Sequence, residues 1–363
     1  MLRKRAAPRG SFFIPVAARA AGASAAKNAR VPLIVTRDLR KVFRSAKRFP
    51  GALGALRGLF SPVYEDRVAV AGLSMEIERG EFIGYLGPNG AGKSTTIKML
   101  TGILVPSGGE IEVAGIVPHR KRRENARNIG VVFGQRTQLY WDLPLVDSFE
   151  LLRAIYGIPQ DRYRRSLDAF VELLEMGDFL RTPVRQLSLG QRMRGDFAAA
   201  MLHEPPILYL DEPTIGLDVV AKEAIRTFVS RVNREQGTTI VLTTHDLADV
   251  ERLCRRIVLI DHGRAIFDGP IERIKNEYGR ERTLVVRFTE TTSAPAIPGA
   301  RLESLEGLTA RFVFDRATQR VDRLVREVSD RYSVEDIAIE EPELEGIIRH
   351  IYTQGYAGEE RSA

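Results

Sequence analysis

The chain has 363 residues, of which 44% are hydrophobic, so it can bury a large core and form one large domain with additions, or two domains. This composition argues against disorder along the whole chain. No run of 18 or more apolar residues occurs, so a membrane role requires a partner. The single cysteine, Cys254, cannot form an internal disulfide and is expected to be a small core residue, which fits a reducing cytoplasm.

The positive charge of the chain is concentrated at its N-terminal end. Eight basic residues precede the first acid, Asp38, and subtracting them from the net charge of +7 leaves −1 for the remainder. We therefore expect no nucleic-acid partner. Residues 1–30 form a basic Ala/Arg-rich tail that we expect to be disordered or to follow from a start codon placed too early. An export signal and a transit-like or membrane-surface segment stay open as alternatives.

Two strands are expected after the tail, at Val31–Val35 and Val68–Ile77, with an inserted loop between them at 44–67. Its apolar residues have helical spacing, although three glycines weaken a helix there: Leu53, Leu56, Leu59 and Phe60. The insert either folds back on its own domain or docks its apolar face onto a membrane partner.

From Glu81 onward, short apolar strands alternate with longer amphipathic segments. The expected strands are Phe82–Leu86, Ile129–Phe133, Ile207–Leu210, Thr239–Thr243 and Ile257–Ile260. Because they are rich in Ile, Val and Leu and lack polar alternation, they predict a parallel sheet covered by helices on both faces. The region from about Asp147 to Leu180 has no strand pattern and predicts a helical insertion in this α/β domain.

The composition changes after Pro270, and a second, small α+β unit is expected at 271–363. Its expected strands and helices are Thr283–Phe288, Thr309–Phe314, Arg320–Tyr332 (helix), Val334–Ile339 and Leu344–Tyr352 (helix). No catalytic constellation occurs there. Cargo sensing, regulation of catalysis, support of dimerisation and a purely structural role all stay open.

The strongest motif begins at Gly87 and matches G-x-x-x-x-G-K-[ST]. It reads Gly87, Pro88, Asn89, Gly90, Ala91, Gly92, Lys93 and Ser94. It follows an expected strand and precedes an expected helix, which is the context that a phosphate-binding loop requires. The glycines let backbone N–H groups surround phosphate oxygens at a helix start. Lys93 is then expected to reach the β- and γ-phosphates of a nucleotide, and Ser94 to bind Mg²⁺.

A second motif is the apolar strand at 207–210, which ends in Asp211 and Glu212. Parallel strands bring functional residues together at their carboxyl ends, so both acids should emerge beside the phosphates. Asp211 suits the magnesium shell, and Glu212 suits polarisation of an attacking water.

With these two motifs in place, the chain resembles the ABC ATPases over about Ile34–Gly269. Four further features resemble that family and follow its order, namely Gln135 (glutamine loop), Leu187-Ser188-Leu189-Gly190-Gln191 (signature), Gly216-Leu217-Asp218 (D-loop) and His245 (switch histidine). The resemblance implies a P-loop NTPase with a RecA-like parallel core, a β subdomain and a helical subdomain at about 136–195, all within a nucleotide-binding domain at 31–270. In the signature, Leu189 departs from the usual Gly, while Ser188 and Gly190 are retained.

The resemblance also implies roles for particular residues. Gln135 and His245 join Glu212 in catalysis, Gln135 also joins Ser94 and Asp211 around Mg²⁺, and Thr95 belongs to the nucleotide-binding set. Phe43 lies where the family stacks an aromatic ring on adenine, and the nearby Tyr64 is the competing candidate.

One chain has one phosphate loop and one signature, so the resemblance implies pairing with a second nucleotide-binding subunit. That subunit is a homodimer partner or a paralogue. In such a pair the signature meets the γ-phosphate held by the other chain, and the helical segment that carries this contact is expected to begin near Gln191.

The function implied is that of an ATP-binding and hydrolysing subunit that works separate membrane permease subunits from the cytoplasmic face of the inner membrane. The segments 133–144 and 187–194 resemble the ABC-2-type exporter branch more than importers. Two other functions stay open: a soluble ABC ATPase in DNA repair or translation, and a regulator that uses ATP only to dimerise.

Overall fold

The computed structural model describes residues 31–46, 64–134, 136–279, 281–341 and 343–354. The chain divides into two compact units, one ending at Asp268 and one beginning at Gly269. None of the described helices combines the length and the hydrophobicity that a membrane crossing requires. The apolar residues of the insert, from Leu53 to Phe60, and the N-terminal tail lie outside the described residues.

A six-stranded sheet forms the centre of the first unit, with the strand order β5-β6-β7-β3-β8-β9. The strands are β3 (Phe82–Leu86), β5 (Ile129–Phe133), β6 (Ile207–Asp211), β7 (Thr239–Thr243), β8 (Arg256–Asp261) and β9 (Arg264–Pro270). The pairs from β5 to β8 are parallel, which confirms the predicted parallel sheet. Strand β9, which follows β8 after a two-residue turn, was not predicted from the sequence.

Both faces of this sheet are buried, because successive side chains of a strand point to opposite sides. Tyr85, Tyr209 and Val241 share one core cluster with Ile97 and Leu100 of α2 (Lys93–Leu100). The alternate set is buried on the other face, where α6 packs against β5: Leu208, Leu210, Ile240 and Leu242. A strand that is buried on both faces has no polar alternation, which is why these strands could be found as continuous apolar runs.

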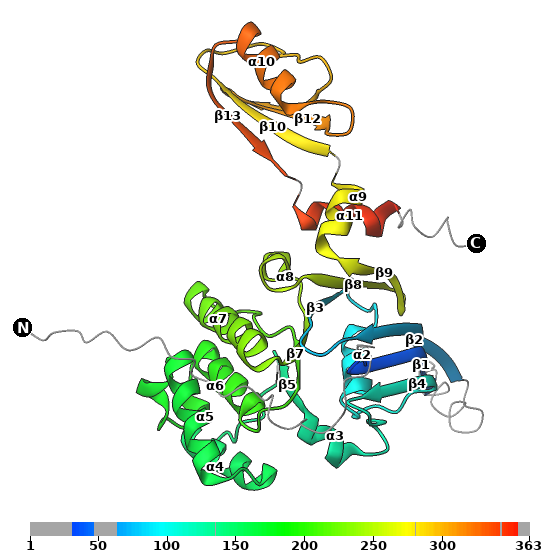
Figure 1. Cartoon of the computed structure of the whole chain (residues 1–363), viewed down its shortest axis with the longest axis vertical. Coiled ribbons are helices and arrows are strands. Elements are labelled where there is room, and N and C mark those ends of the chain that lie inside the picture. Colours follow the sequence, from blue (N-terminus) through cyan, green and yellow to red (C-terminus); the bar gives the residue numbers. More distant parts are fainter. Residues whose placement is uncertain (1–30, 47–63, 135, 280, 342, 355–363) are drawn as a thin grey trace, which may run out of the picture. The chain divides into compact units, whose positions relative to one another are not determined.

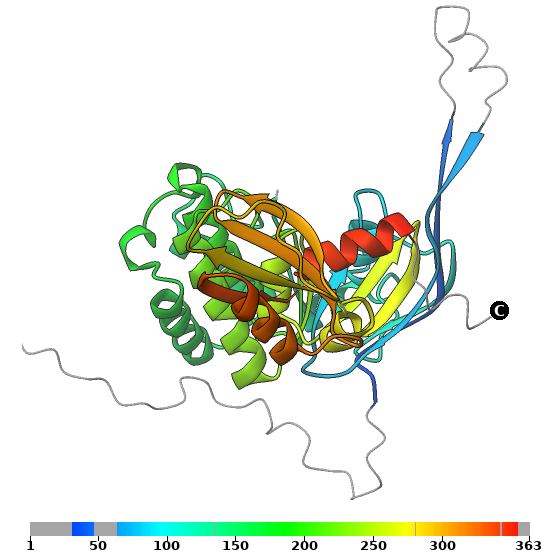
Figure 2. The ribbon, with the colours of Figure 1, turned by 90° about the horizontal axis from the view of Figure 1, so that it is seen from above.

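A three-stranded antiparallel sheet has the order β2-β1-β4, with β1 (Ile34–Ala46), β2 (Tyr64–Ile77) and β4 (Gly108–Val113). The prediction of a first strand at Val31–Val35 was wrong, since the strand begins at Ile34 and continues to Ala46. The predicted bounds of the insert, 44–67, were also wrong at both ends, because residues 44–46 and 64–67 belong to the paired strands β1 and β2. Figure 2 shows β1 and β2 running side by side as a ribbon that projects from the rest of the unit.

Most helices of the first unit follow the phosphate loop in sequence. They are α2, α3 (Arg122–Asn128), α4 (Leu145–Tyr156), α5 (Gln160–Leu173), α6 (Leu189–Met201), α7 (Val219–Gln236) and α8 (Leu247–Leu253), with short 3-10 turns at Gly177–Phe179 and Val184–Gln186. Figure 1 shows α4 to α7 gathered in one group. Helices α4 and α5 confirm the predicted helical character of the region from Asp147 to Leu180.

The second unit contains an antiparallel sheet with the order β11-β12-β10-β13. Its strands are β10 (Glu281–Phe288), β11 (Arg301–Glu306), β12 (Thr309–Asp315) and β13 (Val334–Glu340). Leu324 and Val328 of α10 (Val321–Arg331) complete the core of this sheet. Helices α9 (Ile271–Tyr278) and α11 (Leu344–Gln354) contact each other. Strand β11, at the sheet edge and largely exposed, was not predicted.

One partly buried histidine of the first unit makes stability depend on pH. The ring of His203 stacks on Tyr156 with 4.0 Å between centroids, and Nε2 lies 3.1 Å from the carbonyl oxygen of Ile129. Burial lowers the pKa of His203 from 6.5 to about 4. The folded chain therefore keeps the ring neutral, and this stabilisation is complete above pH 6.5 and is lost as the pH falls toward 4.

We expect the stability advantage of the wild-type chain over His203→Phe to shrink by about 2 kcal/mol between pH 8 and pH 5. Urea unfolding of both proteins at several pH values measures this difference, and groups common to both proteins cancel. A difference in stability that does not change with pH would contradict the assignment of a depressed pKa to His203.

Candidate functional site

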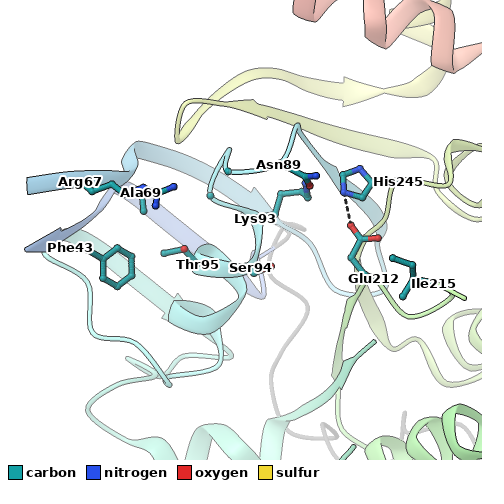
Figure 3. Close-up of a pocket in the computed structure, with 12 residues that line it drawn as sticks. Phe43, Arg67, Ala69, Asn89, Lys93, Ser94, Thr95, Glu212, Ile215 and His245 are labelled. Carbon is teal, nitrogen blue, oxygen red and sulfur yellow. Dashed lines mark ion pairs between the residues drawn. The ribbon is translucent and has the colours of Figure 1, made fainter. Parts of the chain in front are cut away.

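A pocket of about 680 Å³ lies at the carboxyl ends of β3, β6 and β7. Its walls come from the ribbon, from the loop between β3 and α2, and from the segments after β6 and β7. They consist of Phe43, Arg67, Ala69, Asn89, Gly90, Gly92, Lys93, Ser94, Thr95, Glu212, Ile215 and His245. Figure 3 shows Phe43 and Arg67 at one end and Glu212 and His245 at the other. Apart from Arg67, Ala69 and Ile215, these residues belong to the set predicted from the sequence.

The loop from Gly87 to Gly92 has a backbone that few side chains could accept. Gly90 and Gly92 have φ values of 87° and 105°, in the left-handed region, and Gly92 is the N-cap of α2. A Cβ on Gly92 would lie 2.4 Å from the carbonyl oxygen of Ala69, whereas the space beside Gly90 is open. The loop therefore presents bare backbone to the pocket at a helix start, as an anion site requires.

Lys93 is the cation of this loop. Its Nζ donates to the carbonyl oxygens of Gly87, at 2.5 Å, and Pro88, at 3.2 Å. Burial lowers the pKa of Lys93, and the carboxylates of Glu212 and Asp211 oppose that change. A largely desolvated ammonium beside an open backbone cradle is well placed to attract phosphate oxygens.

Two predicted magnesium ligands meet between α2 and β6. The hydroxyl of Ser94 donates to Oδ1 of Asp211 at 3.3 Å, and Thr243 donates to the same oxygen at 2.6 Å. Hydroxyl and carboxylate oxygens that converge from separate elements are the donor set that Mg²⁺ prefers, so these residues fit the ion. Thr243, which ends β7, was not singled out from the sequence, although the rule that located Asp211 at a strand end applies to it as well.

Glu212 has an unusual backbone and an unsatisfied side chain. Its φ is 54°, in a region that non-glycine residues seldom adopt, and its N–H donates to the carbonyl oxygen of Thr243 at 3.0 Å. Nε2 of His245 lies 3.2 Å from Oε1 of Glu212, but the geometry is not that of a hydrogen bond, and Oε1 is buried without a hydrogen-bond partner among the described residues. The residue nevertheless lines the pocket, where a carboxylate can accept a hydrogen bond from water.

Gln135 lies outside the described residues, and Gly134, which precedes it, contacts the end of β6. The N–H of Gly134 donates to the carbonyl oxygen of Asp211 at 2.8 Å, which joins the ends of β5 and β6. A Cβ at Gly134 would lie 2.0 Å from the carbonyl oxygen of Glu212. The chain that leads to Gln135 is thus pressed against the backbone of Glu212. This close approach could be seen only after the strand register was known.

The aromatic end of the pocket favours Phe43 over Tyr64. Phe43 lines the pocket and is 39% exposed, whereas Tyr64 lies elsewhere on the ribbon with Arg44 at 4.6 Å from its ring centroid. The strand register pairs Phe43 with Arg67, so a π face and a cation stand side by side. Arg67 had no sequence signal, because only the register of the ribbon brings it to the pocket.

The signature residues Ser188, Leu189, Gly190 and Gln191 are absent from the pocket walls. Helix α6 begins at Leu189, not near Gln191 as expected, because Ser188 and Gln191 form a capping box. The N–H of Gln191 donates to the Ser188 hydroxyl at 3.2 Å, and the N–H of Ser188 donates to the Gln191 side chain at 2.9 Å. Gly190 therefore sits in the first helical turn, with its N–H at the positive end of the helix dipole.

The D-loop borders the signature. Asp218 is the N-cap of α7 and accepts from the N–H of Ala221 at 2.7 Å. A Cβ on Gly190 would lie 3.1 Å from that of Ala221, and one on Gly216 would lie 3.3 Å from Leu189. Signature and D-loop thus form one contiguous surface within the chain.

Comparisons with known proteins agree with this arrangement. Residues 70–215 match the family described as ABC transporter. A daunorubicin resistance ATP-binding protein of Streptomyces coeruleorubidus is 33% identical over 79% of this chain and 92% of its own length. The Nod factor export ATP-binding protein I of Ralstonia nicotianae is 36% identical over 60% of this chain and 67% of its own. A dimeric ATP-binding cassette in a post-hydrolysis state, bound to ADP and Pi, superposes with a TM-score of 0.55 at 25% identity, covering 66% of this chain and 98% of that one.

Fold and pocket define an ATPase with a P-loop, built on a parallel sheet and bearing a β subdomain and a helical subdomain. The chain belongs to the ATP-binding subunits of ABC transporters. Members bind and hydrolyse ATP with Mg²⁺, dimerise, and work with membrane permease components. A soluble role in DNA repair or translation is not favoured.

Proposed function

We propose that this chain powers an ABC-2-type exporter by ATP hydrolysis at the cytoplasmic face of the inner membrane, peripheral to separately encoded permease subunits. The observation that carries the hydrolytic part is the carboxylate of Glu212, which lines the pocket with His245 at 3.2 Å and Lys93 across from it. ATP consumption favours the cytoplasm, where ATP is available.

In this proposal each wall of the pocket contacts one part of ATP. Phe43 stacks on the adenine, with Arg67 beside it. The loop from Gly87 to Gly92, with Lys93 and Thr95, holds the phosphates. Ser94, Asp211 and Gln135 would hold Mg²⁺, which supplies charge compensation on the phosphates when bound.

The same proposal assigns the hydrolytic step to Glu212 and His245. The carboxylate of Glu212 accepts a hydrogen bond from the attacking water and orients it toward the γ-phosphate. His245, which is half exposed and lines the same pocket, would contact the γ-phosphate itself. Gln135 directly follows Gly134, whose N–H donates to the carbonyl oxygen of Asp211, and in the proposal Gln135 joins Asp211 around Mg²⁺.

Two chains form the complete site in this proposal. The pocket of one chain contains no signature residue. The N-terminus of α6, which carries the signature, lies outside this pocket, and a helix N-terminus can bind an anion. A second copy or a paralogue, arranged head to tail, would bring Ser188 and Gly190 to the γ-phosphate. Leu189 is 36% exposed beside Gly216 and would reach the partner surface.

Support for export comes from the names of the relatives, which concern daunorubicin resistance and Nod factor export. A match over 79% of this chain must extend past Asp268, so the second unit is shared in part with the drug-resistance protein. This second unit is an accessory domain in the proposal.

Size-exclusion chromatography with and without ATP tests the shared site. We expect Glu212→Gln to keep ATP binding and to elute with the mass of a monomer without ATP and with the mass of a dimer when ATP is added. Lys93→Ala should stay monomeric under both conditions. Assembly of the Lys93 variant with ATP, or a Glu212 variant that binds ATP and stays monomeric, would contradict head-to-tail closure on ATP. Co-purification of an integral membrane protein with the tagged chain tests the permease partnership.

A further inference from the structure

A buried carboxylate lies in the helical part of the first unit, away from the pocket. Asp196 is on α6, eight residues after Ser188, and is 3% exposed. Its Oδ1 accepts two hydrogen bonds from the segment that follows Gln135, one from the Thr137 hydroxyl at 2.9 Å and one from the Gln138 N–H at 3.0 Å. The side-chain amide of Gln138 donates in turn to the carbonyl oxygen of Asp196 at 3.1 Å. Three hydrogen bonds therefore join this segment to α6 at one residue.

Neighbouring contacts extend the junction along the same helix. The guanidinium of Arg192, one turn before Asp196, lies 5.5 Å from the ring centroid of Trp141. Gly195 lets the segment approach closely, since a Cβ there would lie 3.1 Å from Leu139. Segment 137–141 is thus attached to α6 by hydrogen bonds, apolar packing and a cation–π contact.

The chemistry of Asp196 explains why an acceptor is needed. Burial raises the pKa of Asp196 to about 7, while the hydrogen bonds from Gln138 and Thr137 and the charge of Arg192 act to lower it. Burying a carboxyl group costs free energy, and its hydrogen bonds from Thr137 and Gln138 offset that cost. An apolar replacement would leave the Gln138 N–H and the Thr137 hydroxyl without their acceptor.

We propose that Asp196 is a positioning residue that locks the segment after Gln135 to the signature helix, so that the two move as one body when the signature meets ATP on the second chain. The proposal rests on the head-to-tail site proposed above. It requires the acceptor atom of Asp196 and not its charge. Motion at the N-terminus of α6 would then reach Gln135 through a single rigid junction.

The test compares Asp196→Asn, which keeps an acceptor oxygen of the same shape, with Asp196→Ala, which removes it. We expect the Asn variant to hydrolyse ATP within about threefold of wild type and the Ala variant to be slower by about tenfold, with unchanged ATP affinity. Ser166→Ala is the matched control, because it removes the hydrogen bond that Ser166 of α5 donates to Glu204 without touching this junction. It should keep wild-type turnover.

Trp141 is the single tryptophan of the chain, so its fluorescence reports on the junction directly. In the nucleotide-free chain we expect Asp196→Ala alone to change its emission and increase quenching by acrylamide. Wild-type emission and turnover in the Ala variant would overturn the proposal, and so would an Asn variant as impaired as Ala. If the wild-type chain itself lacked ATP turnover, the proposed function would fail, while the emission comparison would still decide the role of Asp196.

Discussion

Replacing Glu212 with Gln is expected to lower ATP turnover by about a hundredfold to ten-thousandfold, the range typical of removing a general base. The amide keeps the shape of the side chain and its place 3.2 Å from His245, but it no longer attracts the proton of an attacking water. Because Glu212 has a φ of 54° held by the backbone bond to Thr243, we expect the exchange to leave the backbone unchanged.

Steady-state phosphate release, measured beside equilibrium binding of ATP, separates chemistry from affinity. The affinity of Glu212→Gln for ATP should be the same as that of the wild type or higher, since a negative charge near the γ-phosphate is removed. Lys93→Ala is the contrasting variant, for which we expect binding and turnover to fall together. Turnover by Glu212→Gln within a few-fold of the wild type would show that another group orients the water.

The parallel strands of the catalytic sheet, β3 and β5 to β8, could be predicted almost to the residue, while β9 and much of the rest could not. Phe82–Leu86 and Thr239–Thr243 are buried on both faces and lack glycine or charge at their ends. In contrast, β4 begins with two glycines, which resemble a turn, and only its last four residues show the polar–apolar alternation of a strand. The first strand continues to Ala46 because it pairs with β2, and pairing between distant segments leaves no local signal.

The site shows the same division. Motif and strand-end rules located Lys93, Asp211 and Glu212, since each rule concerns residues close together in sequence. Arg67 and Gly134 matter through cross-strand register, which the sequence does not encode locally. The start of α6 is a different case, because Ser188 and Gln191 match the S-x-x-Q capping box, and that pattern could have placed the helix start correctly.

Mixing two inactive variants is expected to restore activity if each ATP is shared by two chains. Lys93→Ala has an impaired phosphate loop and an intact signature. Gly190→Asp has an intact phosphate loop and an impaired signature. The added side chain at Gly190 would begin 3.1 Å from Ala221 and would present a carboxylate where a phosphate should bind. Each variant alone should lose at least about a hundredfold in turnover.

In the mixed dimer, the phosphate loop of the Gly190 variant meets the signature of the Lys93 variant, so one of the two sites is intact. With random pairing and independent sites, turnover should return to about a quarter of the wild-type value. Lys93→Ala mixed with Glu212→Gln is the matched control, because both residues line the pocket of the same chain and neither pairing yields an intact site. Recovery in the control as well, or no recovery in mixed dimers isolated through two affinity tags, would mean that the signature does not serve the partner's ATP.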